Sequence, residues 1–351
     1  MIKHISFSLV AACLALVSCS PKAAETSPDA QMVPQTLTIY SSRHYDSDRA
    51  LYAAYEEKTG VKVQIREAGA DQLLETMKAE GTNSPADLII AADAGALWRF
   101  QDAGLTQPLD DAEIDAHVPA NLRQSEGHWI GLGKRVRLVA YDPERFTELD
   151  VDAWLKLAEP DKQGEICVRS SSNIYNLSLM AEMIARLGSE GAEAWARGIV
   201  ANMARNPQGG DTDQVRAVAA GQCGIAIVNH YYWLRLATSA SDSDRNIAEA
   251  TKITIPHFPD GKGAHVNITG IAVSASAKDT ELAKDFILFL LSDEGQQMLT
   301  TETKELPISA TAALPEGADM IPAYTPSDTP LDKYGENQAE AQRLYDLAGW
   351  K

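Results

Sequence analysis

A β-α-β unit is indicated by residues 36–65, which read TLTIYSSRHYDSDRALYAAYEEKTGVKVQI. Residues 37–41 form an apolar run with the length of a strand, and residues 48–58 carry apolar side chains at helical spacing. Gly60 stands where a left-handed residue can end that helix. The apolar run at 61–65 then predicts a second strand, so the folded part begins as strand, helix, strand.

The same alternation continues after this unit. A helix is expected at 71–80, a strand at 87–91 and a further helix at 94–103. Asp46 or Ser47 is the predicted cap of the first helix, because either side chain can accept a hydrogen bond from a free backbone N–H. Strands that alternate with helices indicate an α/β fold with a largely parallel sheet.

Two longer strands stand out in the rest of the chain. Residues 131–141 and 266–274 are long enough to pass from one lobe to another, and the chain is long enough for two lobes. We therefore expect two α/β lobes joined by hinge strands. The other expected elements are strands at 165–169 and 223–229 and helices at 176–187, 232–238, 281–291 and 293–301.

The N-terminal residues 1–18 have the layout of a secretory signal, with a basic start and an apolar run, 5–17, that is too short to cross a bilayer. The run ends in Leu-Val-Ser-Cys, which resembles a bacterial lipobox in which Cys19 is acylated. An ordinary cleaved signal with an incidental thiol is the alternative. Residues 19–35 are rich in proline and small residues and are expected to form a flexible tether.

The composition is acidic, with 31 basic and 49 acidic residues and a formal net charge of −18. Such a surface repels nucleic acid and anionic lipid, so we expect no nucleic-acid partner. It is compatible with a cationic ligand, although an acidic surface kept for solubility explains the charge equally well. Composition alone therefore favours a cation only weakly.

Two cysteines remain in the folded part, Cys167 and Cys223. In an exported protein an even pair of this kind is expected to form a disulfide, and we predict that these two are joined. Two buried free thiols are the alternative, because pairing needs Cα atoms within about 7 Å of each other and the sequence does not give that distance.

Polar and aromatic residues gather in three segments that each follow a predicted strand and begin a helix. These segments are SSRHY at 41–45, SSSNIY at 170–175 and NHYYW at 229–233. The ligand crevice of an open parallel sheet lies outside the carboxyl ends of its strands, so all three segments can face one cleft. A single tyrosine there can equally be an amphipathic core residue. Four of the chain's 11 tyrosines lie in these segments, however, and that favours a shared site.

The chemistry of tyrosine indicates the kind of ligand. A phenolate is a hard oxygen donor, which suits a hard cation better than copper(I) or zinc. Tyrosine keeps its proton near neutral pH because its pKa is about 10, but a bound cation of high charge can remove it. Helix N-termini beside Tyr45, Tyr175 and Tyr232 also favour the anionic form. The cluster therefore indicates Fe(III), a common biological ion that can hold several phenolates.

At these residues the sequence resembles the ferric-iron-binding periplasmic proteins of bacterial ABC transporters, and among them the cyanobacterial-type branch that uses tyrosines and one histidine. The resemblance rests on YSSRHY at 40–45, ADLIIAADAG at 86–95, RSSSNIYN at 169–176 and the tyrosine pair at 231–232. It implies the two-lobed, hinge-closing periplasmic binding protein fold of the second structural class, with a central metal cleft. The metal ligands that it implies are His44, Tyr45, Tyr175, Tyr231 and Tyr232.

The resemblance also implies a transport role without catalysis. We expect a monomer, anchored by lipid in the periplasm, that passes Fe(III) to an inner-membrane permease and its ATPase. The expected first lobe is 36–134 with about 262–308, and the second is about 135–261 with 309–351. A binder of a polyamine or an anion such as sulfate is one alternative. An enzyme on the same fold is another, although the sequence contains no nucleophile elbow, phosphate loop or paired Cys/His nucleophile.

Charged residues near the three segments are candidates for supporting roles. Arg43, Arg135 and Arg137 can hold an anion or pair with phenolates, and structural or solvated salt bridges are the alternative. Another branch of the family uses a glutamate after the third strand together with an exogenous anion. Asp93 occupies that neighbourhood here, and we expect it to cap the next helix. Four phenolates exceed the charge of a trivalent ion, so we expect no required anion. His230 is left out of the predicted site, because its side chain can point away.

Overall fold

The computed structural model describes Met1, residues 35–43 and residues 45–351. Residues 2–34, which hold the predicted signal apart from Met1 and the tether with Cys19 apart from Gln35, lie outside the described residues, as does the predicted ligand His44. Residues 35–351 form one compact unit. Within the ranges that the structure describes, no helix combines the length and the hydrophobicity that a membrane span needs.

A mixed sheet runs through this unit in the strand order β2-β1-β3-β9-β5-β7-β6. Its strands are β1 (Thr36–Ser41), β2 (Lys62–Glu67), β3 (Leu88–Ala91), β4 (Thr106–Gln107), β5 (Ile130–Tyr141), β6 (Ile166–Cys167), β7 (Ile225–Asn229), β8 (Lys252–Thr254), β9 (Val266–Ser274) and β10 (Leu306–Pro307). The short strands β8 and β10 pair with β5, and β4 pairs with β9.

Helices cover both faces of the sheet and follow most of its strands. They are α1 (Asp46–Thr59), α2 (Ala70–Glu80), α3 (Ala94–Asp102), α4 (Ala112–His117), α5 (Glu148–Val151), α6 (Ile174–Ala201), α7 (Asp211–Ala219), α8 (His230–Ala237), α9 (Asp242–Glu249), α10 (Thr280–Leu291), α11 (Asp293–Thr301), α12 (Asp332–Glu336) and α13 (Gln338–Ala348). The long helix α6 is kinked at Gly188, where φ is 70°.

The sheet is parallel only within each half of the unit. β1 pairs in parallel with β2 and β3, and β6 pairs in parallel with β7. At the centre, β9 is antiparallel to β3, and β5 is antiparallel to both β9 and β7. The prediction of a largely parallel sheet is wrong for these central strands. Parallel neighbours need a crossover connection, usually a helix, whereas a strand that returns directly from one lobe to the other can pair antiparallel without one.

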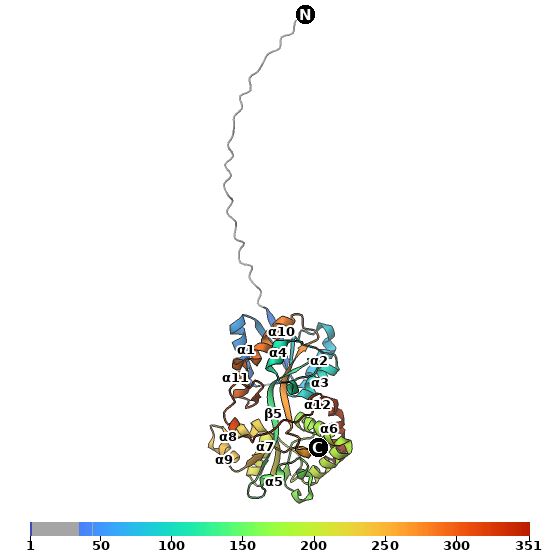
Figure 1. The fold of residues 1–351 in the computed structure, drawn as a ribbon, viewed down its shortest axis with the longest axis vertical. Helices are drawn as coiled ribbons and strands as arrows, with labels where there is room; N and C mark the ends of the chain where they lie inside the picture. The colour runs from blue at the N-terminus through green and yellow to red at the C-terminus, as the bar shows by residue number, and fades with distance from the viewer. Residues whose placement is uncertain (2–34, 44) are drawn as a thin grey trace. The chain divides into compact units, whose positions relative to one another are not determined.

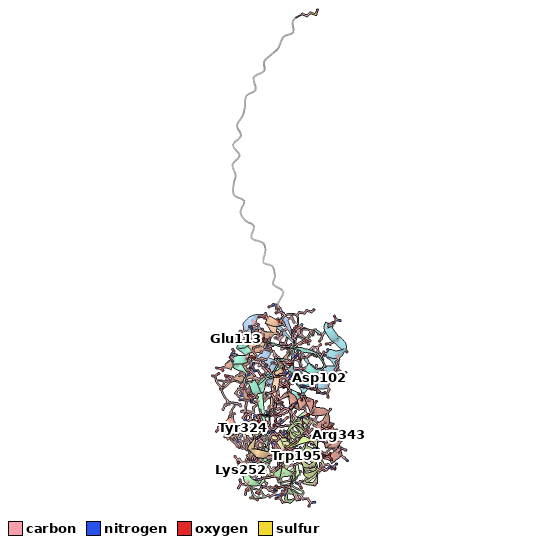
Figure 2. The ribbon with its side chains drawn as sticks, turned by 45° about the vertical axis from the view of Figure 1, so that its right-hand side comes forward. Asp102, Glu113, Trp195, Lys252, Tyr324 and Arg343 are labelled. Carbon is pink, nitrogen blue, oxygen red and sulfur yellow. A yellow bond between two sulfur atoms is a disulfide. The ribbon has the colours of Figure 1, made fainter. Side chains whose placement is uncertain are left out.

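Two lobes are built on separate hydrophobic cores, as the resemblance implied. The first core gathers β1, β3, β9 and α10, and Leu37, Leu88 and Phe286 are among its fully buried side chains. Figure 1 shows α1, α2, α3 and α10 around one half of the unit and α5, α7, α8 and α9 around the other, with β5 running between them. In Figure 2, Glu113 and Asp102 lie in the first lobe, while Trp195 and Lys252 lie in the second.

The second lobe has a core on each face of its sheet. Successive residues of β7 alternate between the two, with Ile225 and Ile227 in one core and Ala226 and Val228 in the other. β5 joins this lobe to the first, because its residues 130–136 pair with β9 and its residues 137–141 pair with β7.

Several predicted boundaries agree with the structure, and the helix cap does not. The strand predicted at 266–274 and the helix predicted at 293–301 are observed with the same bounds. The predicted cap of α1 is wrong: the helix begins at Asp46 itself, and its N-cap residue is Tyr45, which makes no capping hydrogen bond through its side chain. Asp46 therefore lies within the first turn, where its negative charge still favours the helix N-terminus.

The strand predicted at 165–169 is shorter than expected, because only Ile166 and Cys167 pair with β7. The next carbonyls are taken by a side chain: the Asn176 amide donates to the carbonyl oxygens of Arg169 and Ser170 at 3.1 and 2.9 Å. This side chain folds the chain back at the end of β6 and so places the start of α6 beside the strand end.

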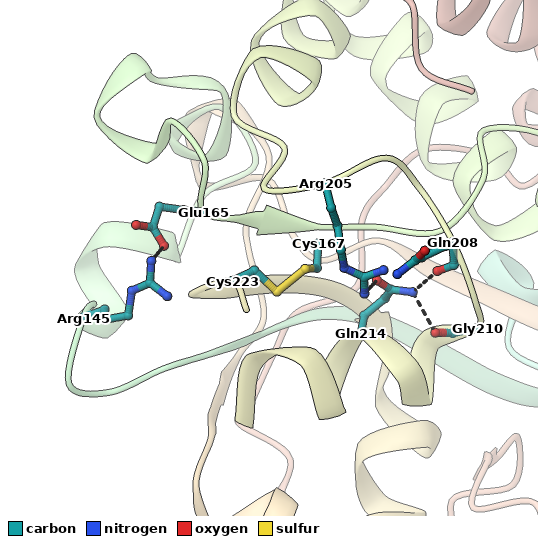
Figure 3. Close-up of a disulfide and its surroundings, with 8 residues drawn as sticks. All are labelled: Arg145, Glu165, Cys167, Arg205, Gln208, Gly210, Gln214 and Cys223. Carbon is teal, nitrogen blue, oxygen red and sulfur yellow. Dashed lines mark hydrogen bonds and ion pairs between the residues drawn. A yellow bond between two sulfur atoms is a disulfide. The ribbon is translucent and has the colours of Figure 1, made fainter. Parts of the chain in front are cut away.

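A disulfide joins Cys167 to Cys223, as predicted, with 6.0 Å between their Cα atoms. Figure 3 shows it at the end of β6, with Arg205 and Gln214 alongside. Cys223 stands two residues before β7, so the bond ties together the two parallel strands that lead into the second-lobe tyrosine segments.

We predict that the double variant Cys167→Ala/Cys223→Ala is less stable to unfolding by about 4 kcal/mol, the value that the chain-entropy argument gives for a loop of this size. The bond closes a loop over a sequence separation of 56 residues. Urea denaturation followed by circular dichroism measures the difference. Thiol labelling of the denatured, unreduced wild type should leave Cys167 and Cys223 unlabelled, and labelling of both would contradict the pairing, whatever the state of Cys13 and Cys19.

Candidate metal centre

Four of the five predicted ligands are described, and all four lie where a helix begins. Tyr45 directly precedes α1, Tyr175 is in the first turn of α6, and Tyr231 and Tyr232 are in the first turn of α8. Each therefore lies near free backbone N–H groups and the positive end of a helix dipole, which favours a negatively charged phenolate. The prediction for His44 remains untested, because that residue is not described.

The four tyrosines converge although they come from three distant segments. The ring centroids of Tyr231 and Tyr232 are 4.4 Å apart. The Arg235 guanidinium lies over the rings of Tyr45, Tyr231 and Tyr232, at 5.3, 5.0 and 5.5 Å from their centroids. Tyr175 is close enough to Tyr45 and Tyr232 for a charge on either to raise its pKa, and a charge on Tyr175 raises the pKa of Tyr231. The structure thus brings these predicted residues together.

Guanidinium groups surround this cluster. The Tyr175 ring is faced by Arg135, Arg137 and Arg169, whose central carbons lie 5.2, 6.0 and 5.3 Å from its centroid. Arg43 lies 4.8 Å from the centroid of Tyr45. These cations stabilise negative charge on the phenol oxygens, and the tyrosine rings attract them in turn.

The sequence prediction missed Arg169 and Arg235. Both carried a readable signal: Arg169 opens the RSSSNIYN segment, and Arg235 follows Tyr231 by four residues, which puts the two on one face of α8. Tyrosine and histidine drew attention to these segments, whereas an arginine on a helix is usually a solvated residue.

Two of the predicted supporting arginines have carboxylate partners of their own. Arg137 is buried and pairs with Asp211 at 2.8 Å, and it also donates to Asn176 at 2.6 Å. Arg43 is buried and pairs with Asp48 at 2.8 Å and with Glu305 at 3.0 Å. The structural salt bridges considered as an alternative therefore exist for both, and the same two side chains also face tyrosine rings.

Arg135 differs from these two. It is buried, donates to the Ile268 carbonyl at 2.7 Å, and has Asp93 as its nearest carboxylate at 4.0 Å. Its Nε has no hydrogen-bond partner among the described residues. Among the causes that raise its pKa, the interaction with Tyr231 comes first and that with Tyr175 second, against the lowering effect of burial. The carboxylates of Glu305 and Asp93 also raise its pKa, so they supply the negative charge beside this cation until Tyr231 and Tyr175 lose their protons.

Asp93 caps α3, as predicted. Its Oδ1 accepts from the Gly95 N–H at 2.8 Å, and its Oδ2 accepts from the Asn267 amide at 2.8 Å. The Ser178 hydroxyl on α6 donates to the same carboxylate at 2.9 Å. Because these donors occupy both oxygens and the residue is 1% exposed, Asp93 has little capacity left to bind a metal.

The histidines that the structure describes do not form a metal site. His230 is buried, its Nδ1 accepts from the Val136 N–H at 3.1 Å, and its Nε2 donates to the Lys304 carbonyl at 3.0 Å. Burial lowers its pKa to about 4, so the ring is neutral at pH 7. In the part of the chain that is described, no three histidine, cysteine, aspartate or glutamate side chains are grouped as metal ligands. The tyrosines therefore remain the candidate ligands.

Two cavities reach the cluster. One, of about 490 Å³, is lined by Tyr45, Arg235 and the carboxylate residues Asp46 and Glu302. The other, of about 370 Å³, is lined by residues of both lobes that include Asp93 and Tyr175. Each cavity thus reaches one tyrosine of the cluster, Tyr45 or Tyr175, while Tyr231 is 0% exposed.

Burial governs the ionisation of the tyrosines in the absence of metal. It is the largest cause that raises the pKa of Tyr45, Tyr175 and Tyr231 above the ordinary value of 10.0, and Arg235 or Arg135 offsets it only in part. These three phenols therefore hold their protons at neutral pH. A cation that binds here has to displace them.

Comparison with known proteins gives a consistent result. The family of bacterial extracellular solute-binding proteins matches residues 50–326. Iron uptake protein A1 of Synechocystis sp. is 37% identical over 346 residues, which cover 99% of this chain and 96% of that protein.

Solved structures of similar proteins also match over most of the chain. A Trichodesmium protein solved in complex with iron and citrate ligands is 40% identical, with a TM-score of 0.85 over 90% of this chain and 100% of that one. A ferric binding protein from Campylobacter jejuni is 36% identical, with a TM-score of 0.84 over 90% of this chain and 100% of that one.

We predict that adding Fe(III), supplied as a nitrilotriacetate chelate, releases protons at neutral pH, because Tyr45, Tyr175 and Tyr231 have raised pKa values and are protonated beforehand. Metal affinity should accordingly rise with pH and fall on acidification. A pH-stat measures the release. Tyr55→Phe is the matched control, since its buried phenol donates to Asp285 outside the cluster. Equal proton release from a Tyr45, Tyr175 and Tyr231 triple phenylalanine variant would contradict the assignment.

Proposed function

The chain belongs to the family of bacterial extracellular solute-binding proteins, and we propose that it captures ferric iron in the tyrosine cluster and delivers it to a membrane transporter. The observation that carries this proposal is the convergence of four phenol groups among guanidinium groups. Similar proteins whose names state iron uptake or ferric binding support the choice of solute over a polyamine or an anion. The function is transport, and no catalytic step is required.

The proposed ligands are His44, Tyr45, Tyr175, Tyr231 and Tyr232. Hard phenolate oxygens match the hardness of Fe(III), and a trivalent ion compensates three of four phenolate charges. The remaining negative charge is balanced by Arg135 and Arg235, and by Arg43, Arg137 and Arg169 as far as their own carboxylates allow. This balance supports a site that needs no added anion.

The proposed lobes are 36–134 with about 262–308, and about 135–261 with 309–351. The separate hydrophobic cores and the crossing of β5 support this division. α12 contacts both lobes: Tyr334 is part of the first core, and its hydroxyl donates to Glu182 on α6 at 2.8 Å.

Iron would then bridge the lobes. Tyr45 belongs to the first lobe, and the other three tyrosines belong to the second, which supplies more anionic donors. We propose that the second lobe holds the ion first and that His44 and Tyr45 join on closure. The ion would stabilise the closed state, because only in that state would it also be bound by His44 and Tyr45.

The transporter partners are a membrane permease and its ATPase, as for other binding proteins of ABC iron transporters. We propose that the protein acts in the periplasm as a monomer and that an acylated Cys19 holds it at the membrane through the tether. The lipobox-like sequence before Cys19 supports this anchor.

Purified protein should acquire a visible phenolate-to-Fe(III) charge-transfer band when iron is added. Tyr231→Phe should remove most of the colour and the binding, because it deletes a buried ligand oxygen while keeping the ring. His44→Ala should keep the colour but weaken the affinity, because the phenolates that give the band remain. Absorbance spectra and chelator competition measure both effects, with Tyr55→Phe as control. An unchanged spectrum and affinity in a Tyr175, Tyr231 and Tyr232 triple phenylalanine variant would overturn the site.

For the anchor, Cys19→Ser should release soluble protein or leave an unprocessed precursor, because no thiol remains to be acylated. Fractionation of membranes and metabolic labelling with a fatty acid follow the change. Continued labelling of the variant would exclude acylation at Cys19.

A further inference from the structure

The segment Thr303-Lys304-Glu305, between α11 and β10, binds three basic side chains with three consecutive residues. The contacts are the Thr303 carbonyl with Arg235 Nη2 (2.8 Å), the Lys304 carbonyl with His230 Nε2 (3.0 Å) and the Glu305 carboxylate with Arg43 Nη1 (3.0 Å). We name residues 303–305 the bridging segment. Each residue of this segment thus forms a hydrogen bond or ion pair with a different basic side chain.

All three basic side chains also contact tyrosines of the cluster. Their tyrosine contacts are Arg43 with Tyr45 (4.8 Å to the ring centroid), His230 with Tyr231 (5.5 Å between centroids, edge to face) and Arg235 with Tyr45, Tyr231 and Tyr232. Arg43 and Tyr45 come from the first lobe, and the other members come from α8 in the second. The bridging segment is therefore connected, through one intervening side chain in each case, to proposed ligands on both sides of the cleft.

The bridging segment is held in one conformation. Lys304 has φ 59°, and among residues 35–43 and 45–351 it is the sole non-glycine residue with a positive φ. Its N–H donates to the Thr300 carbonyl at 2.8 Å, and the Thr303 hydroxyl donates to the Leu299 carbonyl at 2.8 Å. Thr303 and Glu305 are buried at 0% and 1% exposure.

A left-handed residue just after a helix is common, because it allows the last free carbonyls to be satisfied. That ordinary role accounts for the φ of Lys304 and for its bond to Thr300. It does not account for the contacts of the Thr303 and Lys304 carbonyls with Arg235 and His230, since neither contact is needed to end α11. A non-glycine residue in this conformation persists when its surroundings over-determine it, and such residues cluster at ligand sites.

His230 extends the connection to the strand between the lobes. Its Nδ1 accepts from the Val136 N–H of β5, while its Nε2 donates to Lys304. Both nitrogens are thereby used, and the first turn of α8 is fixed to β5 on one side and to the bridging segment on the other. Tyr231 and Tyr232 follow His230 directly in that turn.

We propose that the bridging segment positions the metal ligands across the cleft: its two carbonyls and one carboxylate hold Arg235, His230 and Arg43, and these set the place of Tyr45 relative to Tyr231 and Tyr232. The inference rests on the proposed function, because it assigns a role at the same site. None of residues 303–305 is a proposed metal ligand. They act indirectly, because they position the side chains of Arg235, His230 and Arg43, which in turn contact the tyrosines.

The first test compares Lys304→Gly with Lys304→Val. Both variants lose the lysine charge and its 3.4 Å pair with Glu316, but only glycine adopts a positive φ without strain. The valine variant should bind Fe(III) about 10–100-fold more weakly than the glycine variant, the range found for residues that orient metal ligands. Its charge-transfer band should also shift, because the phenolates meet the ion at altered angles. Glu316→Gln, which removes the exposed partner of the pair, is the control and should match the wild type.

A second pair keeps the test valid if the valine variant does not fold. His230→Gln places a donor near Nε2 and can keep the bond to Lys304, whereas His230→Asn keeps only an acceptor near Nδ1 for Val136. We expect the glutamine variant to hold iron more tightly than the asparagine variant and to retain more of the wild-type band.

The readouts are chelator competition for affinity, the visible spectrum for geometry and thermal unfolding of the metal-free protein for stability. If both pairs differ in unfolding temperature but have equal affinities and spectra, the bridging segment is merely structural and the inference is wrong. If the wild type itself shows no charge-transfer band with Fe(III), the proposed function fails instead.

Discussion

Phenol groups that converge on one ion must each give up a proton, and the repulsion between the resulting charges is the constraint that the rest of the structure meets. Tyr175 alone faces three guanidinium groups, and one further guanidinium, Arg235, is shared by the other three tyrosines. Helix N-termini add positive potential at the same places. The cluster is thus prepared for negative charge before a metal arrives, while burial keeps its phenols protonated until then.

The cations beside the tyrosines create a requirement of their own, because a buried guanidinium needs a partner. Arg137 has Asp211, and Arg43 has Asp48 and Glu305. Charge therefore alternates outward from the site, from phenol to guanidinium to carboxylate. The outermost carboxylates belong to different parts of the chain, so the arrangement links the candidate metal site to α1, to α7 and to the segment before β10.

The fold could largely be read from the sequence, because strand and helix patterns are local. The strand at 266–274 is observed as predicted, and the two-lobed α/β class agrees with similar structures. The antiparallel centre was missed because the direction of β5 relative to β9 depends on partners that are distant in sequence. The short β6 was missed for a comparable reason, since a side chain, Asn176, takes the carbonyls that a neighbouring strand would use.

In the candidate site, too, residues that follow a local sequence pattern were predicted, whereas contacts between residues far apart in the sequence were missed. Tyrosines after strands are visible in the sequence, and their position at helix starts followed from that pattern. Glu305 gave no such signal, because it lies far along the chain from Arg43 and nothing around it resembles a binding motif. Arg235 lies one helical turn from a predicted ligand, so a search for charged residues at that spacing could have found it.

The cap of α3 has a consequence for the water in the cleft. The Asp93 carboxylate, 1% exposed, is completed by the Ser178 hydroxyl from α6 of the second lobe. Separation of the lobes would remove that hydroxyl and leave the carboxylate with the Gly95 N–H and the Asn267 amide, so that water could take the vacated position. Closure would expel that water again, so a movement of the lobes would also exchange one hydrogen-bond partner of Asp93 between water and protein.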